Sequence, residues 1–101
     1  MKKYKLFLNK FAEKDLKNSI EYYNEQQQGL DNEFLLEVKA VILRIENNPY
    51  QFPKIEKEAR KASVNRFPFA VFFVVKEDLI SVFSIFHFSR NPNIWKNRID
   101  K

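Results

Sequence analysis

Few side chains in this sequence can perform acid–base or nucleophilic chemistry. His87 is the only histidine and the only side chain that ordinarily titrates near neutral pH, and the chain has no cysteine. Together with Lys61 and Arg90 it would form a minimal set for acid–base chemistry on a bound phosphate. However, His87 follows Phe83 and Ile85 in a strand-like alternation, which puts it on an apolar face. A hydrogen-bonded structural histidine is the more common case there.

Four arginines in the second half of the chain are candidates for binding: Arg60, Arg66, Arg90 and Arg98. A guanidinium group matches the geometry of carboxylates and phosphates, so each arginine is suited to anchor an acidic protein or a target surface. The competing interpretation is solvated surface charge, which contributes little on its own. Trp95 lies in the same segment, and we expect it to pack on a sheet or to anchor an interface.

Basic residues are concentrated in two short segments. Residues 54–66 hold five basic and two acidic side chains, and residues 90–101 hold four and one, so nine basic against three acidic groups give +6. The rest of the chain carries nine basic and ten acidic groups, which leaves the whole at +5. This clustering favours contact with a polyanion or an acidic protein, and a basic surface kept for solubility is the alternative.

The first half of the chain predicts a strand and two helices. Residues 4–8 favour a short strand, and Asn9 is a plausible N-cap for a helix over about residues 10–27. A second apolar stripe at helical spacing covers residues 34–45 and ends before Pro49. Because the link between the two helices is short, they should form an antiparallel hairpin.

The second half is rich in Val, Ile and Phe and predicts strands that lead into a basic tail. After a loop at residues 49–60, the expected strands are 63–67, 69–76 and 79–88. The tail after Pro92 is expected to form a helical turn.

The last two predicted strands carry apolar residues on both faces. Along residues 79–88 the alternation groups Phe83 with Ile85 on one face and Val82 with Phe86 on the other. Two helices can cover only one face of such a sheet. The second face therefore needs the tail and the 49–60 loop, a second copy of the chain, or a protein partner, and we favour a partner.

Three pieces of sequence, in the same order along the chain, resemble the RelE/ParE superfamily of bacterial toxins. The first is the opening strand and helix with Ala12, Leu16 and Glu21-Tyr22-Tyr23. The second is Asn48-Pro49 followed by Arg66-Phe67-Pro68-Phe69-Ala70-Val71-Phe72-Phe73. The third is His87-Phe88-Ser89-Arg90-Asn91-Pro92 with Trp95 and Arg98, which is similar to the ending of ParE-like members.

The resemblance implies an α+β fold in one domain over residues 1–101. The expected order is β-α-α-β-β-β, with an antiparallel sheet, a helical hairpin packed on one face and a short basic C-terminal tail. It further implies a ParE-like toxin, of the plasmid-stabilisation type, from a bacterial type II toxin–antitoxin module.

The implied partners are a cognate antitoxin, in a toxin–antitoxin hetero-oligomer, and a cellular target. ParE-like members poison DNA gyrase, whereas RelE-like members cut messenger RNA in the ribosome. On the register of residues 67–73, Ala70 stands where RelE-like nucleases carry an arginine. Trp95 takes the place of their C-terminal tyrosine, and an indole nitrogen cannot act as a base. We therefore favour inhibition by binding, without enzymatic activity.

Two alternatives stay open. The first is a metal-independent endoribonuclease that uses Lys61, Arg66, His87 and Arg90, and the second is an orphan binding domain of the same fold. In the favoured interpretation the residues that bind the antitoxin or the target are Arg60, Lys61, Arg66, His87, Arg90, Trp95 and Arg98.

Composition also limits the cofactors and the location that we expect. Without cysteine, and with one histidine, no zinc site of the usual kind is expected, and we expect no cofactor. No apolar run approaches the roughly 20 residues that a membrane span requires, so we expect a cytoplasmic protein without a membrane partner.

Overall fold

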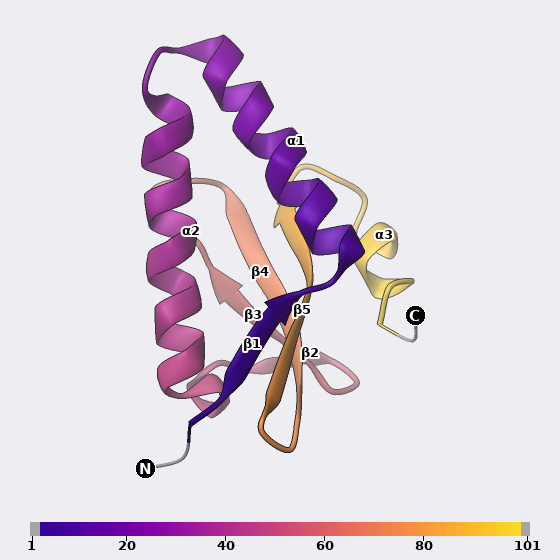
Figure 1. Ribbon diagram of the computed structural model, residues 1–101. Helices are drawn as coiled ribbons and strands as arrows, with labels where there is room; N and C mark the ends of the chain where they lie inside the picture. The colour runs from indigo at the N-terminus through magenta and orange to yellow at the C-terminus, as the bar shows by residue number, and fades with distance from the viewer. Residues whose placement is uncertain (1–2, 100–101) are drawn as a thin grey trace.

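The computed structural model describes residues 3–99 and shows one mixed sheet with two long helices on one face (Figure 1). The elements are β1 (Lys5–Leu8), α1 (Lys10–Gln26), α2 (Leu30–Asn47), the 3-10 turn η1 (Pro49–Gln51), β2 (Lys54–Glu56), β3 (Ala59–Ser63), β4 (Phe69–Lys76), β5 (Leu79–His87) and α3 (Asn93–Lys96). The strand order is β1-β5-β4-β3-β2. The α+β fold with a helical hairpin on one face is confirmed.

The first strand is parallel to its neighbour, so the sheet is mixed and not wholly antiparallel as predicted. Lys5 pairs with Leu79 and Leu8 with Val82, both in parallel register, whereas the pairs from β2 to β5 are antiparallel. Tight turns force antiparallel pairing only between strands that follow one another directly. Because nearly the whole chain lies between β1 and β5, no such turn constrains this pair.

Local signals place the two helices as the sequence predicts. The side chain of Asn9 caps α1 by accepting hydrogen bonds from the backbone N–H groups of Phe11 and Ala12, at 3.0 and 3.1 Å. Gly29 lies between the helices with a φ of 87°, a left-handed conformation that glycine adopts without steric cost. The helix α2 begins at Leu30, four residues before the predicted apolar stripe. The stripe does not reveal this first turn because Asp31, Asn32 and Glu33 are polar.

The prediction of a strand at residues 63–67 is wrong, because β3 lies earlier in the chain, at Ala59–Ser63. Part of the predicted 49–60 loop forms η1, β2 and the start of β3. Ala59 and Ala62 are the buried residues of β3, and such small side chains give only a weak hydrophobic signal. Arg66 has a φ of 70°, and Pro68 lacks a backbone N–H, so the segment that looked like a strand is a turn.

The sheet is buried on both faces, and the chain itself covers the second one. Phe34 and Val71 belong to the main core beneath the helices, whereas Phe72 and Phe86 pack on the other face with Trp95 from α3. Trp95 is only 8% exposed. The favoured expectation that a partner covers this face is therefore corrected, although Phe88 at its margin stays 52% exposed.

A β-bulge in β5 corrects the predicted grouping of its side chains. Phe72 pairs with Ser84 but Phe73 pairs with Val82, so Phe83 is an extra residue in β5. Val82 and Ile85 consequently both face the helices, while Phe83 faces α3. A simple alternation cannot show this, because a bulge shifts every later residue to the opposite face.

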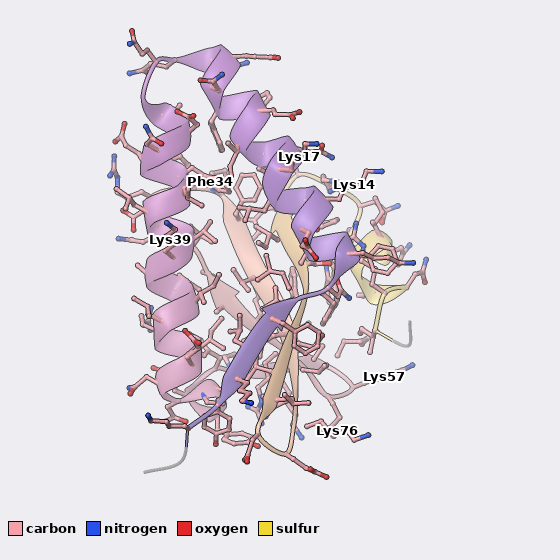
Figure 2. The ribbon with its side chains drawn as sticks, viewed as in Figure 1. Lys14, Lys17, Phe34, Lys39, Lys57 and Lys76 are labelled. Atoms are coloured by element: carbon pink, nitrogen blue, oxygen red, sulfur yellow. The ribbon has the colours of Figure 1, made fainter. Side chains whose placement is uncertain are left out.

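The buried ring of Phe34 should be a main support of the helical layer. It lies 5.1 Å from the ring of Tyr23 and 4.8 Å from that of Phe69, between α2 and the sheet (Figure 2). Phe34→Ala should lower the free energy of unfolding, measured by urea denaturation, by about 3–5 kcal/mol. Leu36→Ala, at a position that is 65% exposed on the same helix, is the control and should change it by less than about 0.5 kcal/mol. Equal losses for the two variants would contradict this packing.

Candidate functional site

Several of the predicted binding residues surround one groove on the second face of the sheet. This basic groove has a volume of about 350 Å³. Its lining residues come from β2, β3, β4, β5 and the tail and are Ile55, Lys61, Phe72, Phe86, His87, Phe88, Arg90, Pro92, Trp95 and Lys96. None of these residues is acidic, so the groove is positively charged.

Each cation of the basic groove lies over an aromatic ring. The Lys61 ammonium is 5.0 Å from the ring centre of Phe88, and the Arg90 guanidinium is 4.5 Å from that of Phe86. Lys96 lies 5.8 Å from the centre of the Trp95 ring. Such cation–π contacts place positive charge beside an apolar surface. This combination suits a partner that presents acidic and apolar side chains together.

His87 is held in a defined orientation at the edge of the groove. Its Nδ1 accepts a hydrogen bond of 2.9 Å from the backbone N–H of Ser89, and its ring meets that of Phe69 edge-on at 5.0 Å. A neutral imidazole that accepts at Nδ1 carries its proton on Nε2. In this arrangement Nε2 is a hydrogen-bond donor and not a general base.

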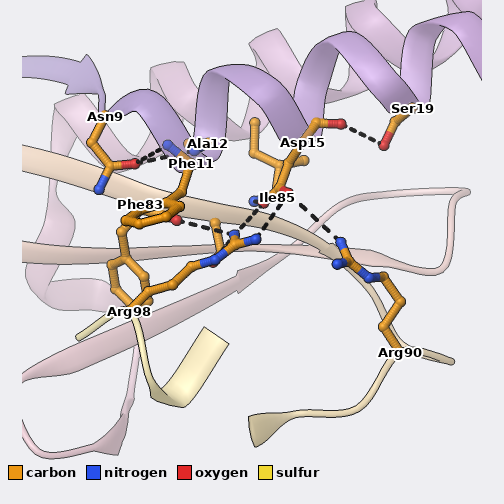
Figure 3. Close-up of polar contacts among 10 residues, drawn as sticks. Asn9, Phe11, Ala12, Asp15, Ser19, Phe83, Ile85, Arg90 and Arg98 are labelled. Atoms are coloured by element: carbon orange, nitrogen blue, oxygen red, sulfur yellow. Dashed lines mark hydrogen bonds and ion pairs between the residues drawn. The ribbon is translucent and has the colours of Figure 1, made fainter. Parts of the chain in front are cut away.

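The tail that completes the groove is fixed by a buried carboxylate. Asp15 on α1 is 6% exposed, and its Oδ2 accepts hydrogen bonds from the guanidinium of Arg98 at 2.6 Å and from the backbone N–H of Ile85 at 3.0 Å (Figure 3). Arg98 also donates to the hydroxyl of Ser84 at 2.8 Å and to the carbonyl of Phe83 at 3.4 Å. The same guanidinium thus ties the tail to α1 and to the β5 bulge.

Arg98 is consequently occupied inside the fold, and Arg90 is only partly so. The Arg98 side chain is 13% exposed. Arg90 lies 3.6 Å from the other oxygen of Asp15, beyond ordinary hydrogen-bond distance, and its side chain is 44% exposed. Arg90 therefore keeps a charge that a ligand can reach, whereas Arg98 and the buried Trp95 act as anchors of the tail.

The other two predicted arginines lie away from the groove. Arg60 donates to the carbonyl of Phe52 at 2.6 Å and lies over the ring of Tyr50. Arg66 pairs with Glu33 of α2 at 2.9 Å and approaches Glu37. The hydrogen bond to Glu33 raises the pKa of the Arg66 guanidinium above its ordinary value. The structure thus brings Lys61, His87, Arg90 and Trp95 together and leaves out Arg60 and Arg66.

Asp15 is the residue that the sequence analysis missed. It follows Ala12 by three positions and precedes Tyr23 by eight, which places it on the buried stripe of α1. An acidic residue on an apolar helical stripe is a detectable signal, because a buried carboxylate requires a partner. Its partner Arg98 is 83 positions away, and spacing cannot reveal such a pair.

Residues 3–99 contain neither a cluster of metal ligands nor a helix that could span a membrane. This part of the chain contains no group of three His, Asp or Glu residues that would hold a metal ion. Within the same range, no helix is long and apolar enough to cross a membrane.

Comparison with known proteins finds matches that extend over most of the chain. The model of the family described as the ParE toxin of the type II toxin–antitoxin system parDE matches residues 6–92. A chain of a solved structure, described as the chromosomal ParDE TA system from P. aeruginosa, is similar with a TM-score of 0.71 and 19% identity. The match covers 83% of this chain and 95% of that one. No curated protein matches significantly.

Removing the charge of Asp15 should release the tail. Asp15→Asn leaves the Arg98 guanidinium without its carboxylate, and the loss of one partner of a buried ion pair should cost about 3 kcal/mol in the free energy of unfolding. Trp95 is the only tryptophan, so its fluorescence should shift to the red as the tail loosens. Glu21→Gln, at an exposed position of α1, should change neither value measurably. An unchanged Trp95 spectrum in Asp15→Asn would show that the pair does not hold the tail.

Proposed function

This chain belongs to the ParE toxin family of type II toxin–antitoxin systems, and we propose that it inhibits a cellular target, DNA gyrase, by binding and without chemistry of its own. A cognate antitoxin neutralises it in a toxin–antitoxin hetero-complex. Membership of a toxin–antitoxin family supports an antitoxin as the partner. The resemblance to ParE-like rather than RelE-like members supports gyrase as the target.

The burial of Trp95 is the observation that carries the proposal of binding. Its ring is stacked on that of Phe72 at 4.4 Å, with 13° between the two planes. An indole has no basic nitrogen, and this one fills the position where nucleases of the superfamily carry a reactive tyrosine. Ala70, at the position of their strand arginine, is fully buried in the same apolar cluster. This face of the sheet is therefore packed as a core and is not equipped as a reaction centre.

The remaining polar groups fit binding better than cleavage. RNA cleavage without a metal requires a base, a proton donor to the leaving oxygen and a cation on the phosphate. His87 would have to give up its hydrogen bond from Ser89 before Nδ1 could act as a base. Arg66, the fourth member of the alternative catalytic set, is paired with α2 and does not reach the basic groove.

The basic groove offers a surface for an acidic segment with apolar anchors. Lys61, Arg90 and Lys96 supply three positive charges around it. Ile55 and Phe88 line it and are 38% and 52% exposed. A buried apolar anchor surrounded by charged contacts is how many interfaces combine affinity with specificity. We assign antitoxin or target binding to this groove, with Arg98 and Trp95 as positioning residues.

The second candidate function is RNA cleavage by a ribosome-dependent endoribonuclease. It is favoured by one observation, that Lys61, His87 and Arg90 line the same groove. A phosphate held by Lys61 and Arg90 would lie near the imidazole, which is a minimal arrangement for acid–base chemistry.

Expression of the chain without its antitoxin separates the two mechanisms. Inhibition of gyrase predicts arrested growth, induction of the DNA damage response and intact messenger RNA. Codon-linked RNA ends, mapped across the transcriptome, would contradict the binding proposal and establish the nuclease. Normal growth at full expression would contradict both and leave an orphan binding domain.

Charge reversal in the basic groove should abolish inhibition selectively. Lys61→Glu places a carboxylate in the groove and should weaken the inhibition of purified gyrase by at least about tenfold, because like charges at an interface cost several kcal/mol. Lys39→Glu makes the same change on the exposed surface of α2 and should leave inhibition unchanged (Figure 2). Both variants should unfold at the same urea concentration as the parent chain. If Lys61→Glu and Lys39→Glu inhibit gyrase equally well, the surface that binds gyrase does not include the basic groove.

A further inference from the structure

A second cleft lies on the other side of the β5 end, between α1 and the sheet. This α1 cleft has a volume of about 640 Å³, which is within the range of small-molecule sites. Phe69 and Ile85 lie among its apolar lining residues, and α1 forms one of its walls. His87, Ser89 and Arg90 also line it, so Arg90 and His87 border both the α1 cleft and the basic groove.

The α1 cleft carries an uncompensated positive charge. Among residues 3–99, Asp15 is the only acidic residue that lines the cleft, and Arg98 neutralises its carboxylate with hydrogen bonds of 2.6 and 3.3 Å. Lys14 and Arg90 remain, and they give the cleft a net charge of about +2. Within residues 3–99, Lys14 makes no ion pair, and Arg90 reaches Asp15 only at 3.6 Å. Both cations are therefore available to an anion.

One stripe of α1 presents a cation, an amide and an aromatic ring to the α1 cleft. Lys14, Asn18 and Tyr22 lie at intervals of four residues, so they share one face over roughly 12 Å. Tyr22 is 55% exposed, so much of its ring surface is open to a ligand. Its ring is held edge-on against that of Tyr23, with 5.3 Å between centres. Asn18 has no side-chain hydrogen bond to any residue in the range 3–99.

We propose that the α1 cleft binds a nucleoside phosphate. Lys14 and Arg90 hold the phosphate, since both cations line the cleft without a hydrogen-bonded carboxylate of their own. The base stacks on the exposed ring of Tyr22, and Asn18 and Ser89, which line the same cleft, donate hydrogen bonds to the ligand. An acidic peptide would use the same cations, but an exposed aromatic ring in a cleft that two cations also line favours a base joined to a phosphate. The ligand is a free nucleotide or one nucleotide of a single strand.

The proposed nucleotide site does not depend on the proposed inhibition of gyrase, although the two surfaces share His87 and Arg90. Lys14, Asn18 and Tyr22 lie outside the basic groove, so a failure of one proposal leaves the other standing. Arg90 connects the two, because its guanidinium faces the Phe86 ring on one side and Asp15 on the other. Occupation of the α1 cleft would fix Arg90 and thereby adjust the basic groove.

Titration of ADP into the full-length chain, followed by calorimetry in about 50 mM salt, tests the site. Saturable binding is expected, and Lys14→Gln should weaken it about tenfold because a charge-assisted contact is lost. Tyr22→Leu should weaken it by at least about fivefold through the loss of stacking. Lys17→Gln is the matched control on α1, because Lys17 lines a different surface, and it should bind ADP like the parent (Figure 2).

The same titration with adenosine, inorganic phosphate and a short single-stranded oligonucleotide distinguishes the ligands. Adenosine and phosphate should each bind much more weakly than ADP. If the oligonucleotide binds and ADP does not, and Lys14→Gln and Tyr22→Leu remove that binding, the site is confirmed with a strand as its ligand. The proposal is overturned if neither ADP nor the oligonucleotide binds, or if Lys17→Gln weakens binding as much as Lys14→Gln.

Discussion

A carboxylate buried between α1 and the sheet constrains the rest of this molecule. Burying Asp15 is costly unless its charge is paired and its oxygens accept hydrogen bonds. Arg98 and the backbone N–H of Ile85 meet that requirement. The pair joins residues 83 positions apart, so it fixes the tail across the body of the fold.

The position of the tail decides what the second face of the sheet can do. Once Arg98 is held, Trp95 lies flat on Phe72 and covers a surface that would otherwise be exposed and apolar. What remains open is the narrower basic groove, where three cations lie over aromatic rings. A packed surface with charge at its margin supports recognition. Reaction chemistry would need polar groups converging on one point, whereas Ala70 and Trp95 are buried in the apolar cluster on this face.

Interactions between residues that are close in the chain determine most of the fold, and these could be predicted from the sequence. The Asn9 cap, the apolar stripes of both helices and the Val- and Phe-rich β4 and β5 depend on neighbours in the chain, and each was predicted. What failed depends on distant partners or on backbone detail. The strand β3 is buried through alanines, the bulge at Phe83 exchanges the faces of β5, and Asp15 finds Arg98 only in the folded state. Among the candidate site residues, spacing suggested Lys61, His87 and Arg90, but it could not separate them from Arg66.

The stoichiometry of inhibition tests most directly whether this chain binds its target or reacts with it. Relaxed plasmid, ATP and purified gyrase would be incubated with increasing amounts of the full-length chain, and the supercoiled product measured, with a translated messenger RNA and ribosomes assayed in parallel. The account predicts that supercoiling stops as the chain becomes equimolar with its gyrase binding sites, while the RNA stays intact. Turnover of many RNA molecules by each chain, with gyrase unaffected at excess, would contradict it.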